Sequence, residues 1–388
     1  MLKIAFYSDT YLPAVDGVVT SMLNFKKELE RRGHKVFIFA PGTIADKKKY
    51  ERNDVFIHTG IKFKPYPQYS VALFPYHSIL KLKRLGVDLI HAQTPFALGF
   101  NGLLASKIGG YPLVGSFHTM LNDSSVSVYL PKNFKSFYRK YMWKYAKFFY
   151  RRCDAVIAPS NSVKAMLERR KIKNVFTVPN GIDTKTFNTK VDPEKAIKAF
   201  GLDTSRKIVL YVGRVSKEKS IDVLLKAMAK ITKKREDVEL VIGGTGPMLD
   251  RMKALAKRLG LDGKVKFLGF VRQDLLPSLY AASTVFCLPS DFETQGIVCL
   301  EAMATGKPVV TANTQVMKEF VKKGKNGELF APGNYLDCSR KIEIVLNNSD
   351  AYKKEAVSTA KQFSLENTTN MLIDVYKDVL GRFTEYQQ

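Results

Sequence analysis

Two glutamates eight positions apart, Glu293 and Glu301, are the residues whose spacing says most about chemistry. They lie between two apolar runs of strand length, in the segment SDFETQGIVCLEAMATGKP of residues 290–308. If this segment were helical throughout, the two carboxylates would be about 12 Å apart, too far for a shared acid/base pair. The spacing fits two hydroxyl clusters on one elongated ligand, with a helix that begins at Gly296 directed at a phosphate. The alternative is two solvated glutamates that flank an ordinary helix.

Other short motifs argue against several classes of nucleotide enzyme. The sequence has no GxxxxGK[ST] motif, so a P-loop NTPase is not predicted. The cluster Gly243-Gly244-Thr245-Gly246 follows a strand-like run, but Pro247 interrupts the fingerprint of a dinucleotide site. Two interpretations of Gly246 stay open, a tight turn and a contact with phosphate or ribose. The sequence has no Asp-x-Asp motif, so a metal held on a donor diphosphate is not predicted.

Together with four other positions, the glutamate segment resembles the retaining glycosyltransferases of family 4, which have the GT-B fold. The segment contributes Glu293, Glu301 and the run AMATGKP that follows. The other positions are Gly17 in PAVDGVV, His118 in SFHT, the run PNGID of residues 179–183, and Gly213-Arg214 with Lys219. The resemblance covers nearly the whole chain. It implies an enzyme that transfers a sugar from a nucleotide donor with retention at the anomeric carbon.

The resemblance also implies a role for each position. The catalytic residues would be His118, Arg214, Lys219 and Glu293. The donor-binding residues would be Gly17, Gly213, Arg214, Lys219, Gly246, Glu293, Gly296 and Glu301. Arg214 and Lys219 would neutralise the departing diphosphate, Glu301 would bind the ribose diol, and His118 would bind a hydroxyl. Front-face departure and attack is favoured, Glu293 as a covalent nucleophile is the alternative, and no metal or other cofactor is expected.

Strand-length apolar runs alternate with helix-period segments along the whole chain, which predicts an α/β fold with parallel strands and crossover helices. The alternation pauses in a polar stretch between Asn180 and Arg206, where we place a domain junction. The expected architecture is GT-B, two Rossmann-like domains facing across a cleft. Residues 1–180 would bind acceptor and membrane, residues 181–365 would bind the nucleotide sugar, and residues 366–388 would form a helix that crosses back to the first domain.

The expected strands are residues 4–8, 35–40, 88–92, 113–117, 155–158, 175–178, 208–212, 238–242, 265–268, 285–288, 308–311 and 327–330. The expected helices are residues 18–32, 76–85, 97–108, 131–152, 162–170, 221–234, 248–259, 275–281 and 297–304, with further helices from residue 336. Four widely spaced cysteines, without a CxxC motif, indicate buried reduced thiols rather than a zinc site or a disulfide framework; they are Cys153, Cys287, Cys299 and Cys338.

The charge of the chain is strongly positive and unevenly distributed. The 388 residues include 62 Lys and Arg against 36 Asp and Glu, a net charge of +26. Residues 1–175 hold 29 Lys and Arg against 11 Asp and Glu, a surplus of 18. The run KNFKSFYRKYMWKYAKFFYRR of residues 132–152 has eight basic residues, nine aromatic residues and no acid. We expect it to bind an anionic membrane surface through Lys132, Lys135, Arg139, Lys140, Trp143, Lys144 and Lys147; the alternative is an aromatic stripe packed on its own sheet.

The acceptor is predicted from a narrower resemblance. Residues 61–74, with FYSDTYLP of residues 6–13, QTPF of residues 93–96 and HTM of residues 118–120, are similar to the branch that contains 1,2-diacylglycerol 3-glucosyltransferases. Residues 121–128 depart from that branch because they are more polar. The favoured function is transfer of glucose from UDP-glucose to a membrane lipid such as diacylglycerol. The alternatives are a mannosyl- or other hexosyltransferase acting on phosphatidylinositol or a soluble acceptor and, in another class, a nucleic-acid-binding protein, although nucleic acid is not the expected partner.

The expected location is the cytoplasmic face of a membrane, with peripheral attachment. Met1 leads directly into the strand-like run LKIAFY, which does not read as a signal peptide. No uncharged run of about 20 apolar residues occurs in the sequence.

Overall fold

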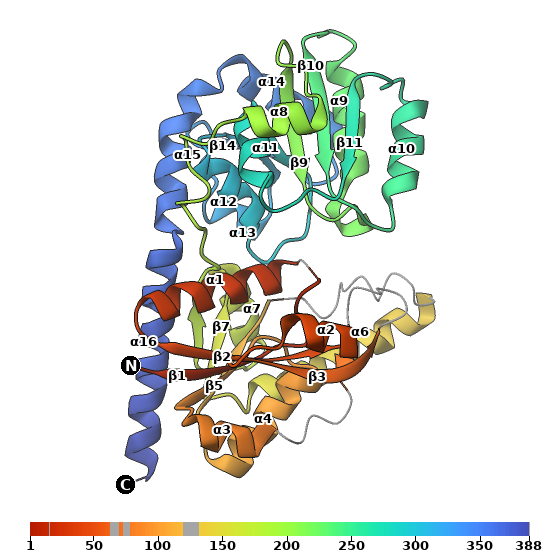
Figure 1. Ribbon diagram of the computed structural model, residues 1–388. Helices are drawn as coiled ribbons and strands as arrows, with labels where there is room; N and C mark the ends of the chain where they lie inside the picture. Colours follow the sequence, from red (N-terminus) through yellow and green to blue (C-terminus); the bar gives the residue numbers. More distant parts are fainter. Residues whose placement is uncertain (15, 63–69, 73–77, 119–131, 388) are drawn as a thin grey trace. The chain divides into compact units, whose positions relative to one another are not determined.

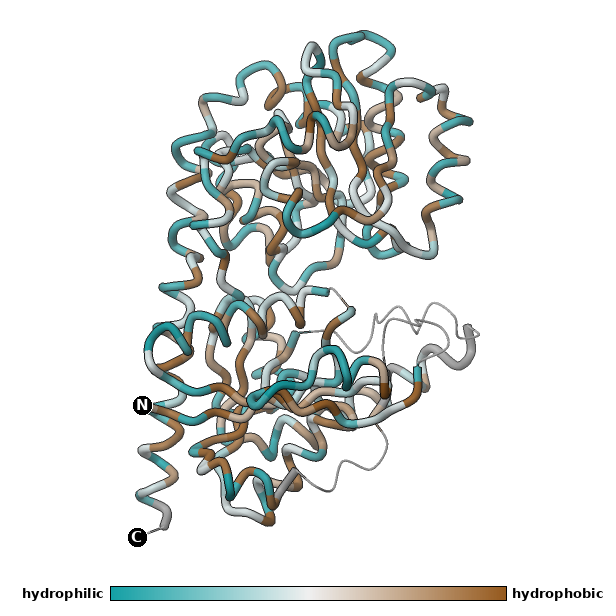
Figure 2. Tube along the Cα trace, viewed as in Figure 1, coloured by the Kyte–Doolittle hydropathy of each residue, from teal (hydrophilic) through white to brown (hydrophobic). Residues whose placement is uncertain are grey.

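The computed structural model describes residues 1–387 except 15, 63–69, 73–77 and 119–131. The chain divides into two compact units. Unit 1 comprises Met1–Gly181 together with Leu365–Gln388, and unit 2 comprises Ile182–Ser364. We had placed the boundaries after residues 180 and 365. Apolar residues concentrate along the strands of both units, whereas hydrophilic residues dominate the outer turns and loops (Figure 2).

Unit 1 is built on one sheet with the strand order β4-β3-β2-β1-β5-β6-β7-β8. Only β4 is antiparallel to its neighbour, β3. The other described pairs are parallel, with Ile4 of β1 opposite Val36 of β2 and Leu89 of β5. The strands are β1 (Lys3–Tyr7), β2 (Lys35–Gly42), β3 (Val55–Lys62), β4 (Ser70–Ala72), β5 (Leu89–Ala92), β6 (Leu113–Ser116), β7 (Ala155–Ala158) and β8 (Val175–Thr177).

Helices cover both faces of this sheet (Figure 1). Successive side chains of a strand point to opposite faces, so Ile4 and Phe6 pack with one set of helices, whereas Ala5 and Tyr7 pack with another. The first set is α1 (Gly17–Arg31) and α16 (Leu365–Gln387). The second set is α3 (Ser78–Leu85), α4 (Ala97–Gly109), α6 (Lys132–Tyr150) and α7 (Asn161–Arg169).

The last helix of the chain, α16, is bonded to the sheet of unit 1 through a buried histidine. His91 of β5 has its Nδ1 atom 2.7 Å from the hydroxyl of Tyr376 and its Nε2 atom 2.8 Å from the hydroxyl of Ser116. Burial lowers the pKa of His91 to about 3, so the ring is neutral at physiological pH. The Tyr376 and His91 rings also meet edge to face. This contact fixes α16 on the face that α1 shares.

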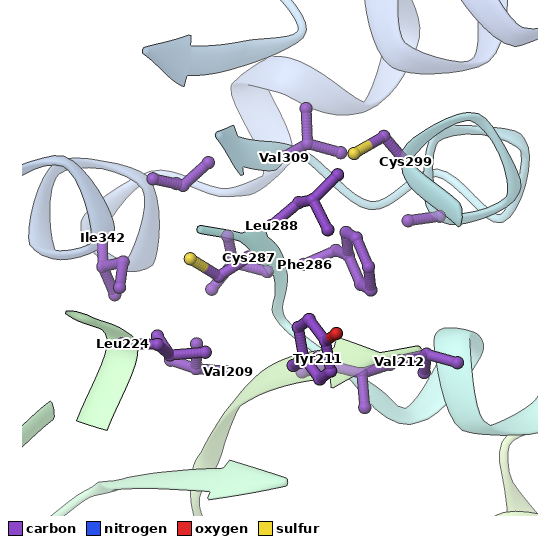
Figure 3. Packing of buried hydrophobic residues seen from close by; sticks show 14 of the residues in the cluster. Val209, Tyr211, Val212, Leu224, Phe286, Cys287, Leu288, Cys299, Val309 and Ile342 are labelled. Carbon is purple, nitrogen blue, oxygen red and sulfur yellow. The ribbon is translucent and has the colours of Figure 1, made fainter. Parts of the chain in front are cut away.

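Unit 2 has a six-stranded parallel sheet with the order β11-β10-β9-β12-β13-β14. Its strands are β9 (Lys207–Val212), β10 (Val238–Gly243), β11 (Val265–Gly269), β12 (Val285–Leu288), β13 (Val309–Ala312) and β14 (Gly327–Phe330). Its helices are α8 (Glu194–Phe200), α9 (Ile221–Ile231), α10 (Leu249–Arg258), α11 (Leu276–Ala282), α12 (Ile297–Ala304), α13 (Gln315–Lys318), α14 (Tyr335–Asn347) and α15 (Asp350–Gln362). Side chains from β9, β12, α9 and α14 fill one core (Figure 3).

The fold confirms the expected α/β class and adds short elements that the sequence did not reveal. These elements are β3, β4, α8, α13 and α2 (Ile44–Tyr50). None of the α2 residues is buried, and α8 buries only Ala196, so neither has the apolar periodicity that marks an amphipathic helix. The second half of β3 is largely exposed, so its sequence also lacks a clear apolar pattern. All four cysteines are buried and form no disulfide. Among the described residues, no helix has the length and apolar character required to span a bilayer.

We predict that Tyr376→Phe will loosen α16. The substitution keeps the buried ring but leaves one nitrogen of His91 without its hydroxyl partner, which costs about 1–3 kcal/mol in a dry site. Amide hydrogen exchange of α16 should therefore become faster. Tyr335→Phe on α14 is the matched control, since Tyr335 is exposed. Unchanged exchange in α16 of the Tyr376→Phe protein would contradict the prediction.

Candidate active site

The candidate donor site of unit 2 lies where the strand order reverses. β9 has β10 on one side and β12 on the other, so the chain leaves the carboxyl ends of β9 and β12 in opposite directions. Ligands of open α/β sheets bind at such a switch point. Gly213 and Arg214 follow β9 directly, and Lys219 ends the 3-10 turn η1 (Lys217–Lys219). Glu293 follows β12. The fold therefore brings the predicted residues of two distant segments to one edge of the sheet.

An ion pair joins the two loops at this edge. The Nζ atom of Lys219 lies 2.6 Å from Oε1 of Glu293, and both side chains are mostly buried. Beneath them, burial raises the pKa of the Cys299 thiol, and the charge of Glu293 adds to the rise while Lys219 opposes it. Burial likewise raises the pKa of Tyr211 on β9, with Glu293 adding and Arg214 opposing. Both cations and the carboxylate therefore lie close to one dry patch of the core.

Glu301 is held by a tyrosine of another helix. The hydroxyl of Tyr280 on α11 donates to Oε2 of Glu301 at 2.8 Å. Burial raises the pKa of Glu301 to about 7, and the hydrogen bond from Tyr280 opposes this rise. The carboxyl is therefore close to half-ionised at neutral pH. The segment is helical only from Ile297 onward, so Glu293 lies in a loop and the spacing of the two carboxylates is not that of one continuous helix.

Two glycines of the candidate donor site are required by the backbone itself. Gly296, the N-cap of α12, has a φ of 83°, which residues with a side chain rarely adopt. A Cβ on Gly246 would lie 2.4 Å from the backbone oxygen of Val215, so the loops after β9 and β10 pack backbone against backbone. Gly296 also has no side chain that could cap α12, which leaves backbone N–H groups at its start for another acceptor. The donor-binding roles of Gly213, Gly246 and Gly296 stay predictions.

In unit 1, polar side chains bridge the corresponding switch point between β1 and β5. Asp9 follows β1 and accepts hydrogen bonds from the Thr94 hydroxyl at 2.6 Å and from the Leu98 amide at 2.7 Å. Burial raises the pKa of Asp9, and these hydrogen bonds oppose the rise. One carboxyl thus holds the loop after β5 and the first turn of α4. Sequence reasoning assigned Asp9 no role.

His118 follows β6 and contacts the loop after β5. Its Nε2 atom lies 3.1 Å from Oε1 of the buried Gln93. Burial lowers the pKa of His118 to about 4, and the charge of Asp16 opposes this shift. The ring is therefore neutral at physiological pH, so it can bind a hydroxyl but is a weak base. His118 also lines a small cavity with residues that include Phe25, His91, Ser116 and Asn180.

Gly17 is the first residue of α1 and differs from the glycines of unit 2. A Cβ built there meets none of the described atoms within 4 Å outside its chain neighbours, so packing alone does not require glycine. The preceding Asp16 caps the helix, because its Oδ1 atom accepts from the amides of Val18 and Val19, both at 2.9 Å. A phosphate at this helix end would therefore compete with a carboxylate. The predicted role of Gly17 in donor binding stays a prediction.

The basic and aromatic run of residues 132–152 forms α6, and its aromatic residues divide between two faces. Phe149 and Tyr150 are buried, whereas Phe137, Tyr141 and Phe148 are exposed. The alternative, a single aromatic stripe packed on the sheet, is therefore wrong, because part of the stripe faces outward. Of the predicted membrane residues, Lys140 and Lys144 are exposed and Lys147 is half-buried. The side chains of Lys132, Lys135 and Arg139 lie outside the described residues.

Trp143 is oriented differently from these lysines. Its ring is stacked on Phe117 with 6.0 Å between centroids, and the guanidinium of Arg170 lies over it at 3.9 Å. The ring therefore packs on the core of unit 1, and its predicted role at a membrane surface stays a prediction. Most of residues 61–74, and all of residues 121–128, lie outside the described residues.

The structure adds partners that no motif indicated. Tyr280 and Gln93 each contact a predicted site residue, but each lies on a separate element, and the pairing depends on strand and helix order. A signal for Gln93 existed, since it directly follows a buried strand end. Among the described residues, no cluster of His, Cys, Asp and Glu has the arrangement of a metal site. The expectation that no metal takes part stays a prediction.

Comparison with known proteins decides the family. Residues 15–186 match the model of Glycosyltransferase Family 4, and residues 192–363 match that of Glycosyl transferases group 1. The chain is 30% identical over 393 residues to alpha-monoglucosyldiacylglycerol synthase of Acholeplasma laidlawii, with 98% of each protein covered. The chain belongs to the family 4 glycosyltransferases. Its resemblance to the diacylglycerol glucosyltransferase branch is thereby confirmed.

Two further relatives of this family 4 enzyme are named for different sugars. The alpha-monoglucosyldiacylglycerol synthase of Streptococcus pneumoniae is 29% identical, with 98% of this chain and 86% of the relative covered. A GDP-mannose-dependent alpha-mannosyltransferase of Mycolicibacterium smegmatis is 28% identical, with 98% of each covered.

Solved structures confirm the GT-B fold of two Rossmann-like domains. HepE of Anabaena, solved in complex with UDP and glucose, superimposes with a TM-score of 0.75 at 24% identity, covering 97% of this chain and 100% of HepE. Sucrose-phosphate synthase of Thermosynechococcus elongatus superimposes with a TM-score of 0.78 at 19% identity, covering 98% and 100%.

We predict that the pH dependence of UDP binding reports on Glu301. If its carboxylate accepts from the ribose hydroxyls, affinity should rise with pH and level off above about 7, the pKa of the free enzyme. Tyr280→Phe removes the hydrogen bond that lowers this pKa, so the midpoint should move to higher pH. Calorimetric titration across pH measures the shift.

Glu301→Gln is the control for this experiment, because it leaves only the titration of the nucleotide itself. Superimposable profiles for Tyr280→Phe and the unsubstituted enzyme would exclude Glu301 from nucleotide binding.

Proposed function

We propose that this enzyme transfers a glucosyl group from UDP-glucose to a membrane lipid with a free hydroxyl, such as diacylglycerol, with retention at the anomeric carbon. The observation that carries the proposal is the Lys219–Glu293 ion pair beside Arg214 at the switch point of unit 2. Two cations there can bind a diphosphate, and a carboxylate beside them can bind sugar hydroxyls. Full-length similarity to two alpha-monoglucosyldiacylglycerol synthases supports the lipid acceptor.

The proposed reaction breaks the bond between the anomeric carbon and the diphosphate oxygen and forms a bond to the acceptor oxygen on the same face. Arg214 and Lys219 stabilise the negative charge that develops on the departing diphosphate. The acceptor proton passes to the departing phosphate oxygen. His118 binds a hydroxyl rather than removing its proton, a role supported by its pKa of about 4.

Glu293 as a covalent nucleophile is the alternative mechanism. The ion pair with Lys219 favours a binding role, because a carboxylate held at 2.6 Å by an ammonium is a weaker nucleophile than a free one. In the favoured mechanism, Glu293 binds donor-sugar hydroxyls and also keeps Lys219 at the diphosphate.

Mannosyl transfer from GDP-mannose is the second candidate function, and similarity to the mycobacterial mannosyltransferase favours it. The roles proposed in unit 2, a carboxylate for ribose and cations for diphosphate, would suit UDP- and GDP-sugars equally. An assay is therefore needed to decide which base and which sugar the donor carries.

The donor and acceptor test uses purified enzyme with labelled UDP-glucose or GDP-mannose and vesicles that contain diacylglycerol or phosphatidylinositol. We expect an α-glucosyl lipid from UDP-glucose and diacylglycerol only, identified by its anomeric proton coupling. A mannosyl lipid from GDP-mannose would replace the first proposal with the second. A β-linked product would exclude retention.

Arg214→Ala and Lys219→Ala should each lower kcat by about 10²-fold or more, because each removes a cation that stabilises the leaving diphosphate. Lys217→Ala is the control, since Lys217 lies on the same turn but is exposed. Thermal unfolding checks the fold, because Lys219→Ala leaves Glu293 without its partner. A variant with near-normal kcat would remove that cation from the mechanism.

A further inference from the structure

One helix of unit 1 has an outer face that is apolar where a solvent-facing helix is normally polar. Between residues 96 and 108, five positions on α4 and its N-cap are exposed: Phe96, Phe100, Leu104, Lys107 and Ile108. Four of them are large apolar residues, exposed by 44%, 36%, 37% and 71%. They recur every fourth residue, so they form one stripe along the helix. We call Phe96, Phe100, Leu104 and Ile108 the α4 stripe.

The α4 stripe is separate from the core-facing side of the helix. The opposite face of α4 is buried, with Leu98 and Leu103 packed in the core beneath the sheet. The helix is fixed at its start by Asp9, which accepts from the Leu98 amide. A stripe of this length spans about 18 Å along the helix axis. Contiguous apolar surface on a rigid helix marks a binding surface.

The helices beside α4 supply positive charge and no negative charge. α3 packs against α4, and Tyr145 of α6 donates to the backbone oxygen of Pro95, just before α4 begins. The sequences of α3, α4 and α6 contain ten Lys and Arg residues and no Asp or Glu. The exposed members with described side chains are Lys83, Arg84, Lys107, Lys140 and Lys144.

This combination identifies the partner by its chemistry. A protein partner would gain from an apolar stripe, but neighbouring helices that carry cations and no acids complement a surface that is uniformly anionic. Exposed Phe, Leu and Ile side chains together with exposed Lys and Arg on neighbouring helices are the features of elements that lie in the interface of an anionic bilayer. The cations attract the headgroups, and the apolar side chains enter the acyl boundary.

We propose that the α4 stripe is the segment that inserts into an anionic membrane, with the cations of α3, α4 and α6 around it. The proposal rests on the proposed function, because it concerns how that enzyme reaches a lipid acceptor. The stripe begins at Phe96, three residues after Gln93, whose side chain contacts His118. The stripe therefore starts, along the chain, close to a residue that contacts the candidate acceptor-binding histidine. Insertion of α4 would present acceptors to His118 without extracting them from the bilayer.

The test compares two pairs of leucine and isoleucine residues that are both on helices and both exposed. Leu104→Gln with Ile108→Gln removes half of the α4 stripe. Leu336→Gln with Ile344→Gln on α14 is the control, since these residues are exposed by 46% and 47% and lie in unit 2. Full-length proteins are sedimented with vesicles of phosphatidylcholine and phosphatidylglycerol, and with vesicles of phosphatidylcholine alone.

We expect the α4 double variant to bind the mixed vesicles roughly tenfold or more weakly, from the loss of two apolar insertions, and the α14 variant to bind like the unsubstituted enzyme. Binding that remains should still decrease with salt, because the cations are unchanged. Equal binding by both variants would overturn the proposal. A second result would also overturn it: the unsubstituted enzyme does not bind vesicles but forms a dimer in sedimentation velocity, and only the α4 variant loses that dimer. The stripe would then join two copies of the chain.

Depth gives a second readout that does not depend on affinity. Phe100→Trp should show a blue-shifted emission and quenching by brominated acyl chains, relative to the background from Trp143, whereas Leu336→Trp should show neither. An unquenched Trp at position 100 on bound vesicles would overturn insertion.

Assays of transfer separate this proposal from the proposed function. Loss of vesicle binding in the α4 variant, with transfer to a monodisperse short-chain diacylglycerol preserved, supports both. Transfer to lipid by an enzyme whose binding does not depend on the stripe overturns only the insertion proposal. Stripe-dependent binding without transfer from any nucleotide sugar overturns only the proposed function.

Discussion

The ion pair between Lys219 and Glu293 is the interaction that ties the charged groups of the candidate donor site to the fold of unit 2. At the switch point between β9 and β12, two loops leave the sheet in opposite directions, and no ladder hydrogen bonds join them beyond the strand ends. The pair joins the two loops, and it lies close to the buried side chains of Tyr211 and Cys299. Removing either partner leaves a mostly buried charge, which is far more costly than losing a surface ion pair. The two side chains proposed to act on the donor are therefore also the ones that join the loops.

In unit 1 the loops at the switch point are also joined by side chains, but the charges there differ. Asp9 and Thr94 bridge its switch point, but the histidines nearby are neutral, with pKa values of about 3 for His91 and about 4 for His118. Unit 2 instead collects full charges at its switch point. Neutral, hydrogen-bonding histidines suit a hydroxyl acceptor, and a site with full charges suits a diphosphate. This contrast supports the division of labour that we propose for the two units.

Sequence reasoning succeeded where burial is complete and failed where it is one-sided. The bounds of β7, β12 and α12 were predicted to the residue, because strands covered on both faces read as continuous apolar runs. The partner of Glu301 could not be predicted, since Tyr280 meets it only through the order of the helices. The position of Gln93 after a buried strand end was a signal, but its pairing with His118 depends on strand order. The α4 stripe was hidden for another reason. The helix is apolar almost all round, so its sequence does not say which side faces out.

The position of α16 in the chain sets the order in which the protein can be completed during synthesis. Residues 182–364 form a continuous unit that emerges from the ribosome before α16. The core that holds Ile4 and Phe6 also needs Leu372, Tyr376 and Val379 of α16. The core on this face of the amino-terminal unit therefore stays incomplete until α16 is translated. The usual order, in which the amino-terminal domain folds first, is reversed, and a nascent chain stalled before residue 365 would expose an apolar sheet face to chaperones.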